Sequence, residues 1–206
     1  MNDRPSRPPF DERYAEPGWA FGAEPNDFLR EMAPRIPRGR VLCLAEGQGR
    51  NAVHLASLGH DVTAMDLSAV GIEGARRLAA ERGVTIHAEV ADLADYAVAP
   101  GAWQGIVSIF VHVPAELRAR VHRAVVAGLA PGGLFVLEAY TPRQLTHDSG
   151  GPSDAARLMT LSDLRRELEG LEFEHALETE RELSEGKWHR GPAAVVQIAA
   201  RQPAKR

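Results

Sequence analysis

The chain of 206 residues contains a single cysteine, Cys43. One cysteine excludes an internal disulfide, and such scarcity is typical of proteins from a reducing compartment. No catalytic signature surrounds Cys43, so we expect a small buried residue on a strand rather than a nucleophile. The eight histidines form no helical His-x-x-x-His pair that also has a suitable third ligand. We therefore predict no obligatory metal.

Long apolar runs are also missing from the sequence. No uncharged apolar stretch approaches the roughly 18 residues that a membrane helix needs, and the N-terminal segment is polar and proline-rich without the apolar core of a signal peptide. The formal net charge is −4 and no block of five or six like charges occurs, so neither nucleic acid nor an anionic membrane is favoured as a partner. These absences predict a cytoplasmic protein and leave the oligomeric state unknown.

What is present is typical of one globular domain, with 44% hydrophobic and 25% charged residues. Residues 1–12 carry three prolines and several charges, so we expect a flexible arm there and a single domain over 13–206. Aromatic residues and turn formers are dense just after this arm. Tyr14, Trp19 and Phe21 could form a lid over a ligand, or could simply pack an N-terminal segment.

The middle of the chain alternates short apolar segments with amphipathic ones. Gly59 and Gly83 are placed to end helices, Ser68 to cap one, and Pro114 to begin one. Such alternation predicts a parallel sheet with right-handed crossovers and helices on both faces. The predicted strands are 40–45, 60–66, 84–92, 103–111 and, after a Pro-Gly-Gly break, 134–140; the last helix before that break has a stripe of Leu117, Val121, Val125 and Leu129.

The end of the chain has a different pattern. After a polar loop at 141–157 and one more helix, two strand-like segments flank the turn region 184–192, which predicts an antiparallel hairpin added to the sheet. Trp188 and His189 are expected to be exposed in that turn. The predicted fold is therefore α/β, a single-domain, doubly wound, mostly parallel seven-stranded sheet of Rossmann-like type with a C-terminal antiparallel hairpin.

The first strand-to-helix turn has the sequence AEGQGRN, residues 45–51. Ligands of open α/β sheets bind beyond the carboxyl ends of the strands, and this turn is the usual place. Gly47 and Gly49 let the backbone approach a ligand, and the next helix offers free N–H groups at its N-terminus. Asp66 ends the second strand, where a carboxylate can accept hydrogen bonds from a ribose diol. The ligand is predicted to contain a nucleoside.

The six residues GQGRNA also match the dinucleotide fingerprint, a weak signal when it stands alone. A short-chain oxidoreductase places a tyrosine four residues before a lysine, and neither Lys187 nor Lys205 has a tyrosine at that spacing. This absence argues against an NAD(P)-binding oxidoreductase or redox sensor, which we keep as an alternative because the fingerprint matches. A non-catalytic nucleoside-binding protein is a second one.

Taken together, the glycine turn, the acidic strand end, the ADL, IFVHVP and PGG segments and the terminal hairpin resemble the class I S-adenosylmethionine-dependent methyltransferases over residues 14–201. Residues 47–66 are most similar to the small bacterial tellurite-resistance and thiopurine methyltransferases. The resemblance implies S-adenosyl-L-methionine as cofactor. It also implies these contacts: Ala45, Gly47 and Gly49 with the methionine part, Asp66 with the ribose hydroxyls, Asp92 and Leu93 with the adenine, and Phe110 near the sulfonium. Leu67, next to Asp66, is a further candidate for cofactor binding.

The chain departs from the family pattern at two positions of the turn. Cys43 stands where an acidic residue is usual, and Ala45 stands where glycine is common. We hypothesise that Glu46 supplies the missing carboxylate, either to the cofactor ammonium or to its positive surroundings.

The acceptor of the methyl group is predicted to be a small molecule, because no large insertion offers a protein-binding or RNA-binding domain. The segment SIFV, residues 108–111, lacks the Asn-Pro-Pro-Tyr motif of enzymes that methylate nucleic-acid bases or glutamine. A thiol or a chalcogen oxyanion reacts as a soft anion and needs no general base, whereas a hydroxyl or amine does. His112, Glu138 and Tyr140 are the candidate catalytic residues, in that order. For His112, ordering of the turn in a His-x-Pro motif is the alternative role.

Overall fold

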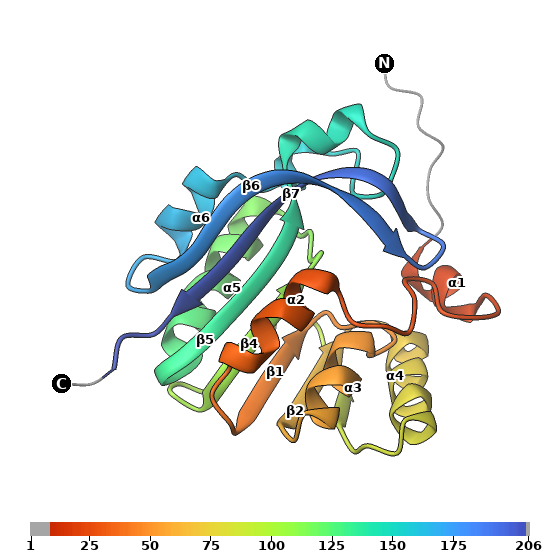
Figure 1. Ribbon diagram of the computed structural model, residues 1–206, viewed down its shortest axis with the longest axis horizontal. Coiled ribbons are helices and arrows are strands. Elements are labelled where there is room, and N and C mark those ends of the chain that lie inside the picture. The colour runs from red at the N-terminus through yellow and green to blue at the C-terminus, as the bar shows by residue number, and fades with distance from the viewer. Residues whose placement is uncertain (1–8, 205–206) are drawn as a thin grey trace.

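The computed structural model describes residues 9–204 of the chain. Their strands form one seven-stranded sheet in the order β3-β2-β1-β4-β5-β7-β6, which runs diagonally through the molecule in Figure 1. The strands are β1 Arg40–Leu44, β2 Asp61–Asp66, β3 His87–Val90, β4 Trp103–Ile109, β5 Leu129–Tyr140, β6 Glu172–Glu185 and β7 His189–Arg201.

The first five strands are parallel neighbours, and the last two form the expected antiparallel hairpin. β1 pairs in parallel with β2 and with β4, and β5 continues the parallel set. β7 then pairs antiparallel with both β5 and β6. The predicted α/β fold with its C-terminal hairpin is confirmed, and the carboxyl ends of β1, β2, β3, β4 and β5 meet at one edge of the sheet.

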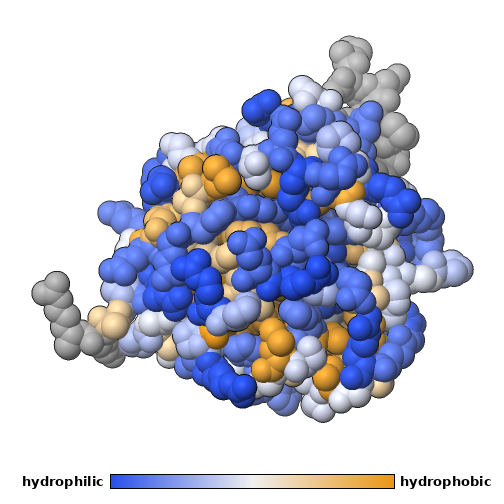
Figure 2. Space-filling view, viewed as in Figure 1, coloured by the Kyte–Doolittle hydropathy of each residue, from blue (hydrophilic) through white to orange (hydrophobic). Residues whose placement is uncertain are grey.

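Helices cover both faces of this sheet. On one face α2 and α3 bury residues such as Leu29 and Leu55, and on the other α5 and α6 bury residues such as Val125 and Leu164. Figure 2 shows that the face with α2 and α3 is mostly hydrophilic, with apolar residues in scattered groups. The helices are α1 Phe10–Ala15, α2 Asp27–Met32, α3 Arg50–Ser57, α4 Ala69–Glu81, α5 Ala115–Gly128 and α6 Leu161–Glu167, with 3-10 turns η1 Ala33–Arg35, η2 Pro142–Thr146 and η3 Ala155–Arg157.

The local signals at the helix ends are mostly where the sequence places them. Ser68 caps α4 by accepting a 2.9 Å hydrogen bond from the Gly71 N–H. Pro114, however, is the residue before α5 and not its first helical residue, and Leu129 begins β5 instead of closing the helical stripe. Cys43 is fully buried on β1, as expected.

Three expectations are corrected by the structure. Residues 1–8 of the expected flexible arm lie outside the described residues, but Phe10–Glu12 belong to α1. The Pro-Gly-Gly segment lies within β5 and does not precede it, because the pairing with β4 shifts register at that point and accommodates an irregularity. His189 was expected to be exposed in a turn, but it is only 7% exposed.

Within residues 9–204, no helix has the length and apolar character required to cross a membrane.

Candidate active site

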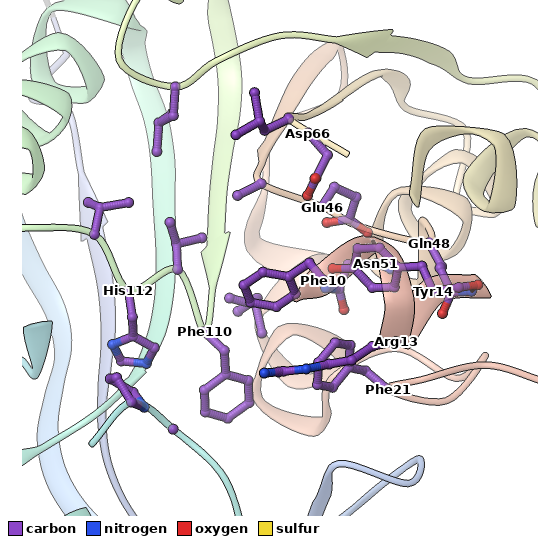
Figure 3. Close-up of a pocket in the computed structure, with 18 of the residues that line it drawn as sticks. Phe10, Arg13, Tyr14, Phe21, Glu46, Gln48, Asn51, Asp66, Phe110 and His112 are labelled. Carbon is purple, nitrogen blue, oxygen red and sulfur yellow. Dashed lines mark hydrogen bonds between the residues drawn. The ribbon is translucent and has the colours of Figure 1, made fainter. Parts of the chain in front are cut away.

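A cavity of about 720 Å³ lies beyond the carboxyl ends of the parallel strands. Its floor comes from the residues that follow each strand, its roof from α1 and the segment after it, and one wall from the start of β7. Figure 3 shows rings from the roof on one side of the cavity and Phe110 and His112 on the other. The predicted site residues that line it are Ala45, Glu46, Gly49, Asp66, Leu67, Asp92, Leu93, Phe110, His112 and Tyr140.

The glycine turn brings the chain from β1 into α3 through left-handed backbone conformations. Gly49 has φ +85°, and a Cβ there would lie 2.6 Å from the Ala75 Cβ of α4. Ala45 has φ +46°, a conformation that costs an L-residue about 1–2 kcal/mol. This explains why glycine is common at that position.

Gly47 has a different role from the one expected. It does not line the cavity; its N–H donates a 2.8 Å hydrogen bond to Asp66 Oδ2, and a Cβ at Gly47 would lie 2.5 Å from the Tyr14 hydroxyl. Asp66 is 8% exposed, and its Oδ1 accepts from the Ser68 N–H at 2.8 Å. Burial raises the pKa of Asp66. Each carboxylate oxygen has a second lone pair with which to accept a ligand hydroxyl.

Glu46 lies on the cavity wall and caps α3. Its Oε1 accepts hydrogen bonds from the N–H groups of Asn51 at 2.8 Å and Ala52 at 2.9 Å. A carboxylate at a helix N-terminus is stabilised by those N–H groups and by the helix dipole. Burial nevertheless dominates and raises the pKa of Glu46 to about 7. A cation in the cavity would favour its ionised form.

The roof is made of aromatic rings from the N-terminal segment. The rings of Phe10, Tyr14 and Phe21 lie within 6.5 Å of one another, and all three residues line the cavity. Trp19 does not; its ring packs under the Arg77 guanidinium at 4.8 Å and against the α3–α4 cluster. Two of the three residues considered as a lid therefore border the cavity, and the third packs a neighbouring cluster.

The opposite wall is also aromatic. Phe110 follows β4 with φ +56°, an unusual conformation for a non-glycine residue. Its ring stacks on Tyr140 at 4.6 Å and meets the edge of His189 at 4.6 Å. Phe21 reaches across from the roof to within 4.6 Å of the same imidazole. His189 thus joins the two aromatic groups.

His112 connects the segment after β4 to the end of β5. Its Nε2 accepts from the Tyr140 N–H at 3.3 Å, and its Nδ1 lies 3.0 Å from the Arg157 carbonyl oxygen. Because a backbone N–H only donates and a carbonyl only accepts, the ring proton is on Nδ1. Burial lowers the pKa of His112 to about 4. Both ring nitrogens are engaged by backbone, which favours the turn-ordering role over proton transfer.

Glu138 does not line the cavity, unlike the other two candidate catalytic residues, His112 and Tyr140. It lies two residues before the end of β5, roughly 7 Å back from the sheet edge at 3.3 Å per residue. The carboxylate is fully buried and accepts hydrogen bonds from Arg181 at 2.7 and 2.8 Å and from Gln197 at 2.7 Å. Glu138 therefore lies outside the cavity that His112 and Tyr140 line.

His189 is the main site residue that the sequence did not reveal. It was expected in an exposed turn, but β7 starts at His189, the hairpin curves toward α1 (Figure 1), and His189 lines the cavity. Its position depends on the curvature of a 14-residue strand, for which no local signal exists. Among residues 9–204, no group of three or more His, Cys, Asp or Glu side chains is arranged to hold a metal ion.

Comparison with known proteins agrees with this arrangement. Residues 41–133, which contain the glycine turn and β2, match the family model described as a methyltransferase domain. This stretch of the chain is therefore similar to the methyltransferase domain family.

Two sequence relatives of the chain are named for different substrates. One is the 2-heptyl-1-hydroxyquinolin-4(1H)-one methyltransferase of Mycobacteroides abscessus, 28% identical over 67% of this chain and 62% of the relative. Another is the tRNA 5-carboxymethoxyuridine methyltransferase of Escherichia coli, 32% identical over 57% of this chain and 45% of the relative. The alignments thus span less than two thirds of the length of these relatives.

Solved structures show the same fold at low identity. A structure from work on the conversion of a disulfide bond into a thioacetal group during echinomycin biosynthesis has a TM-score of 0.75, with 19% identity over 94% of this chain and 88% of that one. TehB from Haemophilus influenzae has a TM-score of 0.71, with 22% identity over 86% and 62%. At these identities the likeness concerns the fold.

Proposed function

We propose that this protein is a class I methyltransferase that transfers a methyl group from S-adenosylmethionine to a small-molecule acceptor. The observation that carries the proposal is one cavity that joins the glycine turn and the acidic end of β2 to a chamber of aromatic rings. When bound, the cofactor supplies a methyl group on a positively charged sulfur, so the protein has to bind, orient and exclude water. The aromatic faces suit a cation of this kind.

The described residues fit the cofactor. Asp66 is oriented by two N–H groups, and its remaining lone pairs are available for the ribose hydroxyls. Leu67, Asp92 and Leu93 line the adjoining part of the cavity, where we place the adenine. Gly47 acts through its hydrogen bond to Asp66. Ala45 and Gly49 provide backbone beside the methionine part, and Phe110 lies on the wall assigned to the sulfonium.

Glu46 is assigned to the cofactor ammonium, as the chain has Cys43 where an acidic residue is usual. Glu46 borders the cavity and is held at the N-terminus of α3. Its raised pKa means that an ionised Glu46 lacks a sufficient positive partner in the protein itself. The ammonium group would supply one.

For the acceptor we propose a thiol or another soft anion, including a chalcogen oxyanion. Of the bases predicted from the sequence, His112 is held by backbone on both sides and Glu138 is buried away from the cavity. Neither is placed to take a proton, so an acceptor with an acidic proton fits best. A nucleic-acid acceptor is disfavoured by the net charge of −4. The hydroxyquinolone named for one relative supports a small acceptor.

We also propose a cytoplasmic location.

Thermal unfolding with separate ligands tests the cofactor assignment. At about 100 times the dissociation constant a native-state ligand adds roughly 2.7 kcal/mol, or about 5 to 10 °C for a chain of this size. We expect that shift with S-adenosylmethionine and its demethylated product. A shift with NAD or NADP alone would instead favour the oxidoreductase alternative. Methyl transfer to thiols, tellurite and tRNA would then be measured with a radiolabelled methyl group; binding without turnover of any of them would favour the non-catalytic alternative.

A further inference from the structure

Among the described residues that line the cavity, the histidines are His112 and His189, and His189 lies on the aromatic side of the cavity with Phe21, Phe110 and Tyr140. Its ring lies 4.6 Å from Phe21, 4.6 Å from Phe110 and 5.7 Å from Tyr140. The aromatic faces around the imidazole suit a flat molecule. His189 is thus placed beside Phe110, on the wall assigned to the sulfonium, where a methyl acceptor would have to lie.

A carboxylate lies directly behind this imidazole. Glu185 ends β6 opposite His189 in the hairpin register, with its Oε2 3.9 Å from His189 Nδ1. Its side chain accepts hydrogen bonds from Arg50 at 2.6 Å, Arg181 at 2.7 Å and Asn26 at 3.0 Å. Although burial alone raises its pKa, the interaction with His189 and the Arg50 ion pair hold the pKa of Glu185 well below its usual range.

The Glu185 position is fixed from several elements. Arg50 opens α3, Arg181 comes from β6 and Asn26 is the N-cap of α2. Arg50 also donates to the Phe21 carbonyl oxygen at 3.0 Å, so the same network anchors the roof. At 3.9 Å from Nδ1 this anion acts on the His189 ring through its charge, which stabilises the protonated imidazole.

We propose that His189, beside the Glu185 carboxylate, is the catalytic base that takes the proton from a protic acceptor, a flat molecule with a thiol or acidic hydroxyl. This rests on the proposed methyl transfer. Glu185 faces Nδ1, which assigns proton transfer to Nε2. The proton of the S–H or O–H group moves to Nε2, the electron pair that it leaves forms the bond to the methyl carbon, and the pair of the broken carbon–sulfur bond stays on the cofactor sulfur.

Charged and titratable groups face His189 from each neighbouring element. Glu185 lies on β6, Tyr140 on β5 and His112 after β4. Arg50 and Arg181 stand behind Glu185. These groups can also titrate. A change in the pH profile of His189→Gln is therefore assigned to His189 only if a control histidine variant does not show the same change.

The test compares 2-naphthol with 2-naphthalenethiol, which share a skeleton and differ in acidity. In the full chain, His189→Gln should lower kcat/KM for 2-naphthol by about 10² to 10⁴-fold, the usual range for a general base. The loss should be smaller for the thiol, because thiols ionise more readily than phenolic hydroxyls. The acidic limb of the pH profile should disappear, and added imidazole should restore part of the activity of His189→Ala.

His87→Gln is the matched control, because this histidine is on β3, 71% exposed in its side chain, and outside the cavity. It should leave both acceptors unaffected. Calorimetry should give the same S-adenosylmethionine affinity for wild type, His87→Gln and His189→Gln, which establishes that the variant is folded. Equal losses on both acceptors, an intact acidic limb or no imidazole rescue would overturn the role of His189.

The two proposals fail in distinguishable ways. Absence of S-adenosylmethionine binding by wild type would overturn the proposed function, and this inference with it. Binding of the cofactor without methylation of either naphthalene would overturn the acceptor class and the role of His189, while methylation of another acceptor would keep the proposed function.

Discussion

The Gly47 amide donates a 2.8 Å hydrogen bond to Asp66 Oδ2, which joins the turn after β1 to the end of β2. Asp66 Oδ1 meanwhile accepts from the Ser68 N–H at 2.8 Å. The two bonds leave the carboxylate one orientation, beside the cavity. A binding group that is fixed before its ligand arrives loses little entropy on binding.

Asp66→Asn should weaken S-adenosylmethionine binding by about 1.5 to 3 kcal/mol, the range for hydrogen bonds to a charged group. The amide also directs an NH₂ group at a backbone N–H that needs an acceptor. Calorimetric titration measures the loss. Asp61→Asn, at the exposed start of β2, is the control and should bind normally. Equal affinities for the two variants would rule out the ribose role.

Glu46→Gln should weaken cofactor binding by a similar amount, about 1.5 to 3 kcal/mol. The glutamine oxygen can still accept from Asn51 and Ala52, so the α3 cap is preserved and only the charge is lost. A cofactor analogue without the amino group separates the two effects. It should bind wild type and Glu46→Gln alike; a persistent difference would show that Glu46 acts elsewhere.

Ala45→Gly should stabilise the protein, because Ala45 has φ +46°. Relief of about 1–2 kcal/mol of left-handed strain is offset by the 0.5–1 kcal/mol entropic cost of glycine, which leaves a net gain of about 0.5–1 kcal/mol. Urea unfolding measures it. The same substitution at Ala79, inside α4, should destabilise the protein. A loss at both positions would contradict the strain argument.

The sequence predicts the sheet and most of the cofactor side of the cavity because these depend on local signals. Alternating apolar segments, Gly59, Gly83 and the Ser68 cap determine strand and helix boundaries within a few residues. Parallel strands then bring residues such as Asp66 and Phe110 to one edge, whatever the details of packing.

The rest depends on contacts between distant segments. Glu138 faces α2 and β6 rather than the cavity, because its carboxylate accepts hydrogen bonds from Arg181 and Asn26. These residues are 43 and 112 positions away from Glu138 in the sequence. His189 enters the cavity through the curvature of the hairpin, and Gly47 is covered by Tyr14 of α1. None of these contacts has a period or motif in the sequence.

Glu46 and His112 should give the free protein opposing dependences of stability on pH. Burial raises the pKa of Glu46 to about 7, so the folded state holds the proton longer and loses stability as pH rises from about 4.5 to 7. Burial lowers the pKa of His112 to about 4 from the ordinary 6.5, so the unfolded state takes up the proton first and stability falls as pH drops from about 6.5 to 4.

Each term amounts to about 3 kcal/mol over its window, since one pKa unit corresponds to 1.36 kcal/mol. The two largely cancel in wild type, but single variants separate them. Relative to wild type, Glu46→Gln should gain stability as pH rises from 4.5 to 7, and His112→Gln should gain stability as pH falls from 6.5 to 4. Urea unfolding at half-unit pH intervals measures both differences. Parallel curves for all three proteins would mean that both groups keep ordinary pKa values, and would remove the electrostatic reason for assigning Glu46 to a cation.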